Sequence, residues 1–148
     1  MNYMNVRQRR ILLADDDEDD RLFFIEALNK VTPEVIIESE IDGVQLMHKL
    51  RQTDELPGMI FLDLNMPYKD GKECLIEIKS TPNLNEIPVI IFSTSSHHRD
   101  VEDTYRHGAN LYVQKPSGFD EMVSTLKKIL TLDWTDYMPK PDRSKFIL

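Results

Sequence analysis

Cysteine is almost missing from this sequence, since Cys74 is the only one among 148 residues. A single cysteine excludes an internal disulfide and any metal cluster built on several thiolates, and it suits reducing surroundings. Basic residues are also scarce: 18 Lys and Arg face 26 Asp and Glu and leave a net charge of −8. A protein of this charge repels DNA, RNA and anionic lipid, so we expect no nucleic-acid partner.

Long apolar runs are absent as well. The basic N-terminal stretch is followed by only four apolar residues, 11–14, before an acidic run begins. That run is shorter than the apolar segment of about 7 to 15 residues in a signal peptide. No stretch approaches the ~18 apolar residues of a membrane helix. We therefore expect a cytoplasmic protein that makes no contact with a membrane.

Five short runs rich in Ile, Val, Leu and Phe alternate with longer segments of helical period. Several of these runs lack an alternating polar face, as expected for strands that helices cover on both sides. The alternation predicts βαβ units around a parallel sheet, and therefore an α/β fold. The predicted strands are residues 11–14, 35–37, 59–62, 87–92 and 111–113.

Apolar residues at helical spacing predict one helix after each strand. The third predicted helix begins near Gly71 and stops before Pro82, and the fourth covers residues 98–107 and ends at Gly108. The (βα)5 pattern covers residues of about 8 to 131 as one domain, and leaves residues 132–148 as a C-terminal tail. The apolar stripes are Leu22, Ile25 and Leu28 for the first helix, Val44, Met47 and Leu50 for the second, and Phe119, Met122, Val123, Leu126, Ile129 and Leu130 for the fifth.

Polar residues follow four of the five predicted strands. Because ligands bind beyond the carboxyl ends of the strands in an open α/β sheet, these residues are the candidates for a functional site. They are Asp15 and Asp16 after the first strand, Asp63 after the third, Ser93 and Thr94 after the fourth, and Lys115 after the fifth.

Three carboxylates that converge on one edge repel each other unless one is protonated or a cation joins them. Mg²⁺ prefers oxygen ligands and takes one or two carboxylates together with a phosphate oxygen, which fits a site rich in acids. The metal lowers the charge around Asp63 and leaves its carboxylate able to attack phosphorus and form an aspartyl phosphate. Lys115 would then supply a positive charge, and Ser93 a hydroxyl donor, to the phosphoryl oxygens.

Four segments in this order resemble the motifs of a response-regulator receiver domain of the CheY type. The resemblance implies a flavodoxin-like, doubly wound three-layer sandwich with sheet order 2-1-3-4-5. It covers residues of about 8 to 131. The segments are 11–16 (ILLADD), 60–67 (IFLDLNMP) with Asp70 and Gly71, 88–93 (PVIIFS) and 108–116 (GANLYVQKP).

Carried over residue by residue, the resemblance implies that Asp63 accepts a phosphoryl group from a phosphohistidine on a sensor kinase or phosphotransfer protein. It also implies a switch aromatic at Tyr112, whose ring turns inward when the hydroxyl residue moves toward the phosphate. The resemblance indicates a signalling protein rather than an enzyme, although a receiver assists its own phosphotransfer and dephosphorylation. Implied metal ligands are Asp15, Asp16, Asp63 and the backbone carbonyl of Asn65, with Ser93 and Lys115 as phosphoryl-binding residues.

Two other classes of protein share part of this pattern. Asp15, Asp17, Asp19 and Glu26 match four ligand positions of an EF-hand calcium loop, but Asp20 stands where that loop needs glycine. An aspartyl-phosphate phosphatase of the haloacid dehalogenase type also places an acidic nucleophile after a strand. That family wants a second Asp two residues beyond the nucleophile, whereas this chain has Asn at position 65.

The tail, residues 132–148, holds apolar and aromatic residues among prolines and charges. It is too short for an output domain, so the chain resembles the stand-alone regulators, including those paired with phytochrome-like histidine kinases. Two uses of the tail stay open: packing against the domain, or forming an interface with a downstream protein or a second copy. A homodimer could also use the face formed by predicted helix 98–107, strand 111–113 and helix 119–130.

Overall fold

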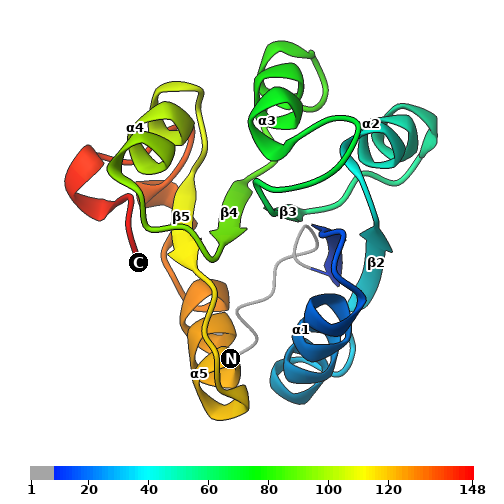
Figure 1. The fold of residues 1–148 in the computed structure, drawn as a ribbon, viewed down its shortest axis with the longest axis vertical. Helices are drawn as coiled ribbons and strands as arrows, with labels where there is room; N and C mark the ends of the chain where they lie inside the picture. The colour runs from blue at the N-terminus through cyan, green and yellow to red at the C-terminus, as the bar shows by residue number, and fades with distance from the viewer. Residues whose placement is uncertain (1–8) are drawn as a thin grey trace.

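The computed structural model describes residues 9–148, so the predicted start of the domain at residue 8 lies just outside the described part. Within it, five parallel strands alternate with five α-helices, and the sheet has the order β2-β1-β3-β4-β5 (Figure 1). This confirms the predicted α/β fold and its strand order. The strands are β1 (Arg10–Ala14), β2 (Ile36–Glu40), β3 (Met59–Leu62), β4 (Val89–Ser93) and β5 (Leu111–Gln114). The helices are α1 (Glu18–Val31), α2 (Gly43–Gln52), α3 (Gly71–Ser80), α4 (His98–Arg106) and α5 (Phe119–Leu130), followed by the short 3₁₀ helices η2 (Trp134–Asp136) and η3 (Arg143–Lys145).

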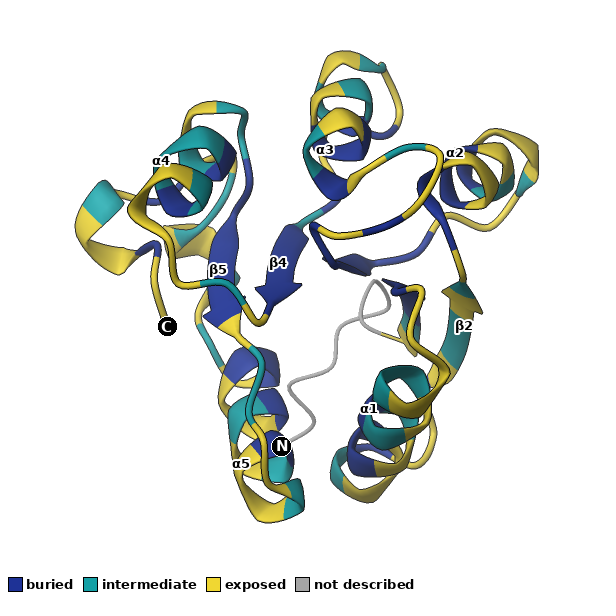
Figure 2. Ribbon diagram, in the orientation of Figure 1, coloured by how far each residue is buried: buried dark blue, intermediate teal, exposed yellow. Residues whose placement is uncertain are grey.

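The sheet lies between two layers of helices. Helices α1 and α5 cover one face, and α2, α3 and α4 cover the other (Figure 1). Successive residues of β1 point to opposite faces: Ile11 and Leu13 join the core under α1 and α5, whereas Leu12 and Ala14 join the core on the opposite face. Strands β1, β3 and β4 are therefore buried on both faces, which explains their continuous apolar sequences (Figure 2).

The bounds of β2 correct the prediction. The strand covers Ile36–Glu40 rather than residues 35–37, and its second half is polar. It is an edge strand with partly exposed side chains, and Glu38 forms ion pairs with Arg10 and Lys49. Because charged residues complete the strand, a search for an apolar run could not show its full length.

Two further strands differ from prediction at their ends. β4 begins at Val89 instead of residue 87, since Pro88 has no N–H to donate to the ladder. At the other end, β4 includes Ser93 and β5 includes Gln114, whose backbones pair with each other. Both strands therefore carry polar residues directly into the carboxyl edge of the sheet.

Two helical stripes were assigned partly to the wrong face. Leu22 and Val44 are about half exposed, at 52% and 53%, although both belong to a predicted apolar stripe. In α1 Leu28 is buried as predicted, and the other buried residues are Phe24 and Ala27, which lie outside the predicted stripe. A spacing of three residues drifts around a helix of 3.6 residues per turn, so the first member of each stripe lies outside the contact face.

The loop after β3 passes close to the end of that strand. A Cβ atom on Gly71 would lie 2.2 Å from the carbonyl oxygen of Asp63 and 2.7 Å from the Cα of Leu64. The Gly71 N–H donates to the Leu64 carbonyl at 3.0 Å. Only glycine fits this approach, which starts α3 directly beside Asp63.

The tail packs back on the domain. Trp134 and Tyr137 contact the core beneath α1 and α5, while Phe146 is fully buried in the core on the other face of the sheet. The side-chain amide of Asn110 joins the domain to the tail: its Nδ2 donates to the carbonyls of Tyr137 and Pro139, both at 3.0 Å. Self-packing, one of the two predicted uses of the tail, is therefore confirmed.

We expect Asn110→Ala to lower the free energy of unfolding by about 2–4 kcal/mol, because it leaves buried partners without a hydrogen bond. Besides its two tail acceptors, the Asn110 Oδ1 accepts from the Val89 N–H and from Lys79 Nζ, each at 2.9 Å. Urea unfolding followed by circular dichroism measures the loss. Asn85→Ala is the matched control, since Asn85 is exposed. Equal losses in the two variants would contradict the role given to Asn110.

Candidate functional site

Three carboxylates meet at the carboxyl ends of β1 and β3. Asp15 and Asp16 directly follow β1, and Asp63 directly follows β3, the neighbouring strand. One oxygen from each carboxylate lies within 4.8 Å of the other two. Asp15 and Asp63 are buried, at 2% and 7% exposure, whereas Asp16 is exposed. The cluster is therefore open to solvent on the side of Asp16.

Lys115 reaches this cluster from the end of β5. Its Nζ donates to Asp15 Oδ2 at 2.7 Å and to Asp63 Oδ2 at 3.1 Å. Burial alone disfavours the charged ammonium, but the hydrogen bond to Asp15 and the charges of both carboxylates outweigh it and raise the pKa of Lys115. Lys115 therefore stays protonated throughout the physiological pH range.

Asp63 is in an unfavourable environment for a charge. Burial is the main reason that its pKa is raised, the neighbouring Asp15 raises it further, and Lys115 opposes both. One lysine cannot neutralise three carboxylates, so a divalent cation would relieve the remaining repulsion. All three donors are carboxylate oxygens, the ligands that Mg²⁺ and Mn²⁺ prefer, so the residues present fit such a cation.

Ser93 lies beside Lys115. It is fully buried at the end of β4, and its carbonyl accepts from the Lys115 N–H at 2.8 Å, which joins the ends of β4 and β5. The Ser93 Oγ accepts from the Ser95 N–H at 3.1 Å. Asn65 is exposed, and its N–H is 3.4 Å from Asp63 Oδ1; the role of its carbonyl as a metal ligand stays a prediction.

Tyr112 points into the protein, with 2% of its surface exposed. Its hydroxyl donates to the carbonyl of Ser95 at 2.8 Å, and burial raises the pKa of the phenol. The ring therefore adopts the inward position that the resemblance associates with a hydroxyl residue drawn toward the phosphate. Ser95 connects Tyr112 to Ser93, because its carbonyl accepts from the Tyr112 hydroxyl and its N–H donates to the Ser93 Oγ.

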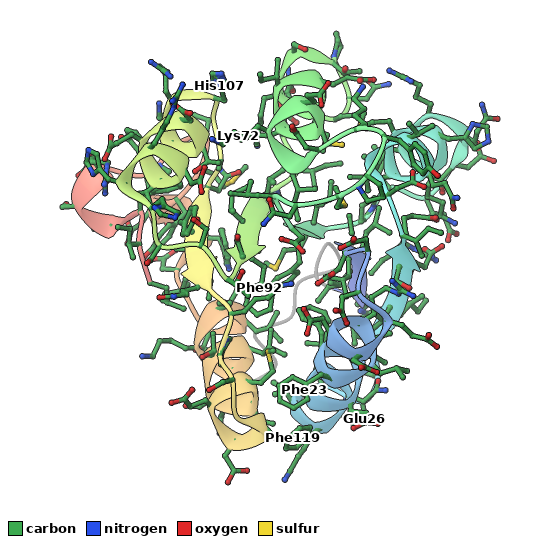
Figure 3. The ribbon with its side chains drawn as sticks, viewed as in Figure 1. Phe23, Glu26, Lys72, Phe92, His107 and Phe119 are labelled. Atoms are coloured by element: carbon green, nitrogen blue, oxygen red, sulfur yellow. The ribbon has the colours of Figure 1, made fainter. Side chains whose placement is uncertain are left out.

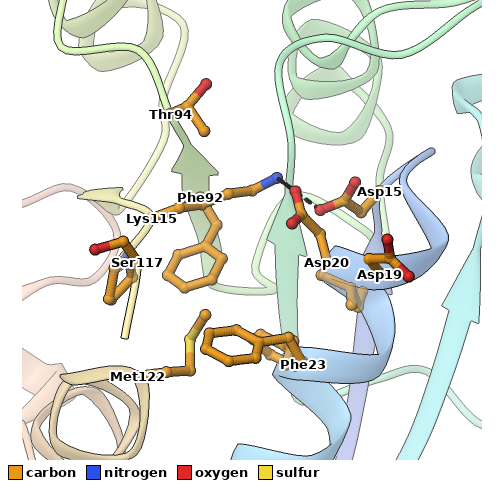
Figure 4. Close-up of a pocket in the computed structure, with 12 residues that line it drawn as sticks. Asp15, Asp19, Asp20, Phe23, Phe92, Thr94, Lys115, Ser117 and Met122 are labelled. Atoms are coloured by element: carbon orange, nitrogen blue, oxygen red, sulfur yellow. Dashed lines mark hydrogen bonds and ion pairs between the residues drawn. The ribbon is translucent and has the colours of Figure 1, made fainter. Parts of the chain in front are cut away.

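Asp20 also belongs to the cluster, a contact that sequence reasoning missed. Asp20 lies in the first turn of α1, and Asp17 caps that helix by accepting from the Asp20 N–H. In addition, Asp20 Oδ2 accepts from Lys115 Nζ at 3.0 Å (Figure 4). The sequence offers no signal that singles out Asp20, because residues 15–20 are all acidic.

A cleft of about 360 Å³ lies beside Lys115, between α1 and α5. Phe23, Phe92 and Met122 form its apolar floor, and Asp19 and Asp20 lie at its edge (Figure 4). The ring of Phe23 also packs edge-on against Phe119 of α5, with centroids 5.8 Å apart (Figure 3). The charged cluster thus borders an apolar surface that both helices provide.

The EF-hand interpretation is wrong. Asp19 and Glu26 lie within α1, which runs over Glu18–Val31, so the twelve-residue segment is not a loop. Cys74 is fully buried in the core, and burial raises the pKa of its thiol to about 12, as expected for a small core residue. His97 and His98 are exposed at the start of α4.

A parallel sheet of order β2-β1-β3-β4-β5, with helices on both faces and polar residues at its carboxyl edge, is the architecture of flavodoxin-like proteins. A model of the family described as response regulator receiver domain matches residues 11–127. The chain therefore belongs to the response regulator receiver family, whose members are phosphoacceptors in two-component signalling, and neither the phosphatase nor the calcium-binding alternative is favoured. The family resemblance stated from the four motifs is confirmed.

Relatives and solved structures agree with this assignment. The response regulator Rcp1 of Synechocystis is 33% identical over 88% of this chain and 92% of its own length. The phosphorylated cyanobacterial phytochrome response regulator RcpA has a TM-score of 0.77 and 33% identity, over 88% of this chain and 94% of its own. The Mn²⁺-bound form of Rcp1 has a TM-score of 0.76 and 32% identity, over 90% of this chain and 99% of its own.

Proposed function

We propose that Asp63 is the phosphoacceptor of a stand-alone regulator in which Asp15, Asp16 and Asp63 hold Mg²⁺, with the backbone carbonyl of Asn65. The observation that carries this proposal is the convergence of Lys115 on Asp15 and Asp63, at 2.7 and 3.1 Å, beside a third carboxylate. This arrangement provides a nucleophile, a fixed positive charge and oxygen ligands for a cation within one small volume.

Asp63 attacks the phosphorus of a phosphohistidine. The bond between the Asp63 oxygen and phosphorus forms, the bond between phosphorus and the imidazole nitrogen breaks, and that nitrogen keeps the electron pair. Ser93 and Lys115 donate hydrogen bonds to the phosphoryl oxygens, on which negative charge is spread. Mg²⁺, when bound, neutralises part of that charge and of the carboxylate cluster.

The donor is a sensor histidine kinase or a phosphotransfer protein. We propose a phytochrome-like kinase, because the similar protein RcpA is described as a cyanobacterial phytochrome response regulator. The phosphorylated form signals by protein contact with a downstream target, and the surface of α4, β5 and α5 or the tail can also support a homodimer. The net charge of −8 argues against nucleic acid as a partner.

The location that fits this role is the cytoplasm, where histidine kinases present their phosphoryl groups. Within residues 9–148, none of the helices combines the length and apolar character that crossing a bilayer requires. The single cysteine, buried and unpaired, also suits a reducing compartment.

Incubation with acetyl phosphate separates the regulator from the phosphatase alternative. We expect at most one phosphate per chain, formed with Mg²⁺ and not formed when a chelator removes the metal before the donor is added, because the carboxylates need a cation before the phosphoryl group can approach. Intact-protein mass spectrometry counts the phosphoryl groups, since each HPO₃ unit adds about 80 Da to the mass of the chain.

A free phosphate ester such as p-nitrophenyl phosphate provides the second arm of this experiment. The regulator releases no nitrophenol beyond about one equivalent per chain, whereas a phosphatase releases many equivalents. Multiple turnover of the ester, or labelling by acetyl phosphate that persists without a divalent cation, would contradict the proposed function.

A further inference from the structure

The end of the tail packs against Tyr112 on the open edge of β5. The N–H of Tyr112 donates to the Phe146 carbonyl at 2.9 Å, and the Leu148 N–H donates to the Tyr112 carbonyl at 3.1 Å. The Phe146 ring is fully buried, with centroids 5.0 Å from the ring of Tyr105 and 6.2 Å from that of Tyr112. Phe146 thus packs edge-on against the Tyr112 ring.

Tyr112 is bonded in turn to the residues of the proposed phosphoryl site. Its hydroxyl donates to the Ser95 carbonyl at 2.8 Å, and the Ser95 N–H donates to Ser93 Oγ at 3.1 Å. The Ser95 hydroxyl donates to Asp100 of α4 at 2.6 Å. A continuous set of contacts therefore runs from Phe146 through Tyr112 and Ser95 to the Ser93 hydroxyl.

We infer that Phe146 is a positioning residue for phosphoryl binding, which it promotes by holding Tyr112 inward so that Ser95 fixes the Ser93 hydroxyl. This inference rests on the proposed function of Asp63 and Ser93. With Phe146 in place, the Tyr112 ring is buried against it, and its hydroxyl is bonded to the Ser95 carbonyl. Without Phe146, the ring gains space to leave, and Ser95 loses its bond to the Tyr112 hydroxyl.

The tail has other anchors that do not involve Tyr112. Arg143 donates to Glu102 of α4 at 2.9 and 2.5 Å, and Tyr105 donates to the Pro141 carbonyl at 2.9 Å. Truncation of Phe146 therefore leaves the rest of the tail attached to α4. The effect of that substitution can be measured on a tail that is still docked.

The coupling is reciprocal, as linkage requires. If a docked Phe146 favours the arrangement that binds a phosphoryl group, then a bound phosphoryl mimic must favour the docked Phe146 by the same factor. The exchange of the Leu148 amide hydrogen, which is bonded to the Tyr112 carbonyl, reports on docking in the unaltered protein.

Beryllofluoride, a phosphoryl mimic, tests the inference when it is titrated at fixed Mg²⁺ by isothermal calorimetry. We expect Phe146→Ala to raise its Kd by about tenfold, within the usual range of coupling between sites, and Phe146→Leu to restore part of the affinity. In a Tyr112→Ala background, Phe146→Ala should leave the Kd unchanged, because the residue acts through Tyr112.

Trp134→Ala is the matched control, since Trp134 is another aromatic tail residue but packs in the core beneath α1 and α5. We expect its Kd to match that of the unaltered protein. Beryllofluoride should also slow exchange of the Leu148 amide by about tenfold.

The possible results separate the two proposals. If the unaltered protein binds beryllofluoride only with Mg²⁺, but Phe146→Ala leaves the Kd unchanged or Tyr112→Ala fails to remove its effect, the role of Phe146 is wrong and the proposed function stands. If the unaltered protein shows no Mg²⁺-dependent binding of beryllofluoride, the proposed function itself is wrong.

Discussion

Asp63→Asn should abolish phosphorylation by acetyl phosphate and leave the fold intact. The amide cannot act as the nucleophile that forms an aspartyl phosphate, so we expect labelling to fall to the level of a chain without donor. Mass spectrometry of the intact protein measures the labelling, and far-UV circular dichroism checks the fold. The substitution is nearly isosteric at a site with 7% exposure, so packing should be preserved.

Asp17→Asn is the matched control for this variant. It makes the same chemical change in the same acidic run, and asparagine caps a helix as well as aspartate does, so α1 should keep its start. Asp17→Asn should therefore be labelled like the unaltered protein. Continued labelling of Asp63→Asn would place the acceptor on another residue.

Asp63→Asn should also change the stability of the folded protein, in a direction that the pKa of Asp63 determines. Because the pKa of Asp63 is raised in the folded protein, its contribution is favourable when the group is protonated and is lost as the pH rises through that raised pKa. At neutral pH and without a divalent cation, Asp63→Asn should therefore unfold at higher urea concentration than the unaltered protein. The difference should shrink at pH 4 and below, where Asp63 is increasingly protonated.

Lys115→Ala should have the opposite effect on stability. Lys115 has 10% side-chain exposure and is the cation bonded to Asp15, Asp20 and Asp63, so its removal leaves buried carboxylates without that partner. We expect a loss of about 2–4 kcal/mol without metal, below the full cost of a broken buried pair because Asp20 is 46% exposed and screened by solvent. Urea unfolding at pH 7 measures it.

Mg²⁺ should restore much of the free energy of unfolding that Lys115→Ala loses, because a divalent cation replaces the missing positive charge among the carboxylates. Phosphorylation of Lys115→Ala remains possible, but the response of Tyr112 and the tail should weaken. Lys128→Ala is the control, since Lys128 is exposed on α5. Equal stability of the two variants without metal would contradict the central place of Lys115 in the cluster.

The sequence predicted the fold where burial dictates residue type. β1, β3 and β4 are covered on both faces, so each is a run of apolar residues that ends where the chain meets solvent at the carboxyl edge. For the same reason Asp15, Asp63, Ser93 and Lys115 could be placed together before any coordinates, and the structure brings them together. The edge strand β2 was placed less well, since half of it is polar.

The sequence could not predict contacts that depend on direction in space. The bond between Asp20 and Lys115 joins residues 95 positions apart, and a run of acids gives no sign of which member turns toward the sheet. The tail presented the same difficulty, because its aromatic residues suit self-packing and interface use equally. The burial of Phe146 against Tyr105 and Tyr112 settles its place on the β5 edge.

The most direct test of the account is to locate the phosphoryl group. The protein is labelled with acetyl phosphate and Mg²⁺, the acyl phosphate is reduced with borohydride, and the digested peptides are sequenced by mass spectrometry. The account predicts that Asp63 alone is converted to homoserine, and only when Mg²⁺ is present. Conversion at another carboxylate, or at Asp63 without a divalent cation, would contradict it.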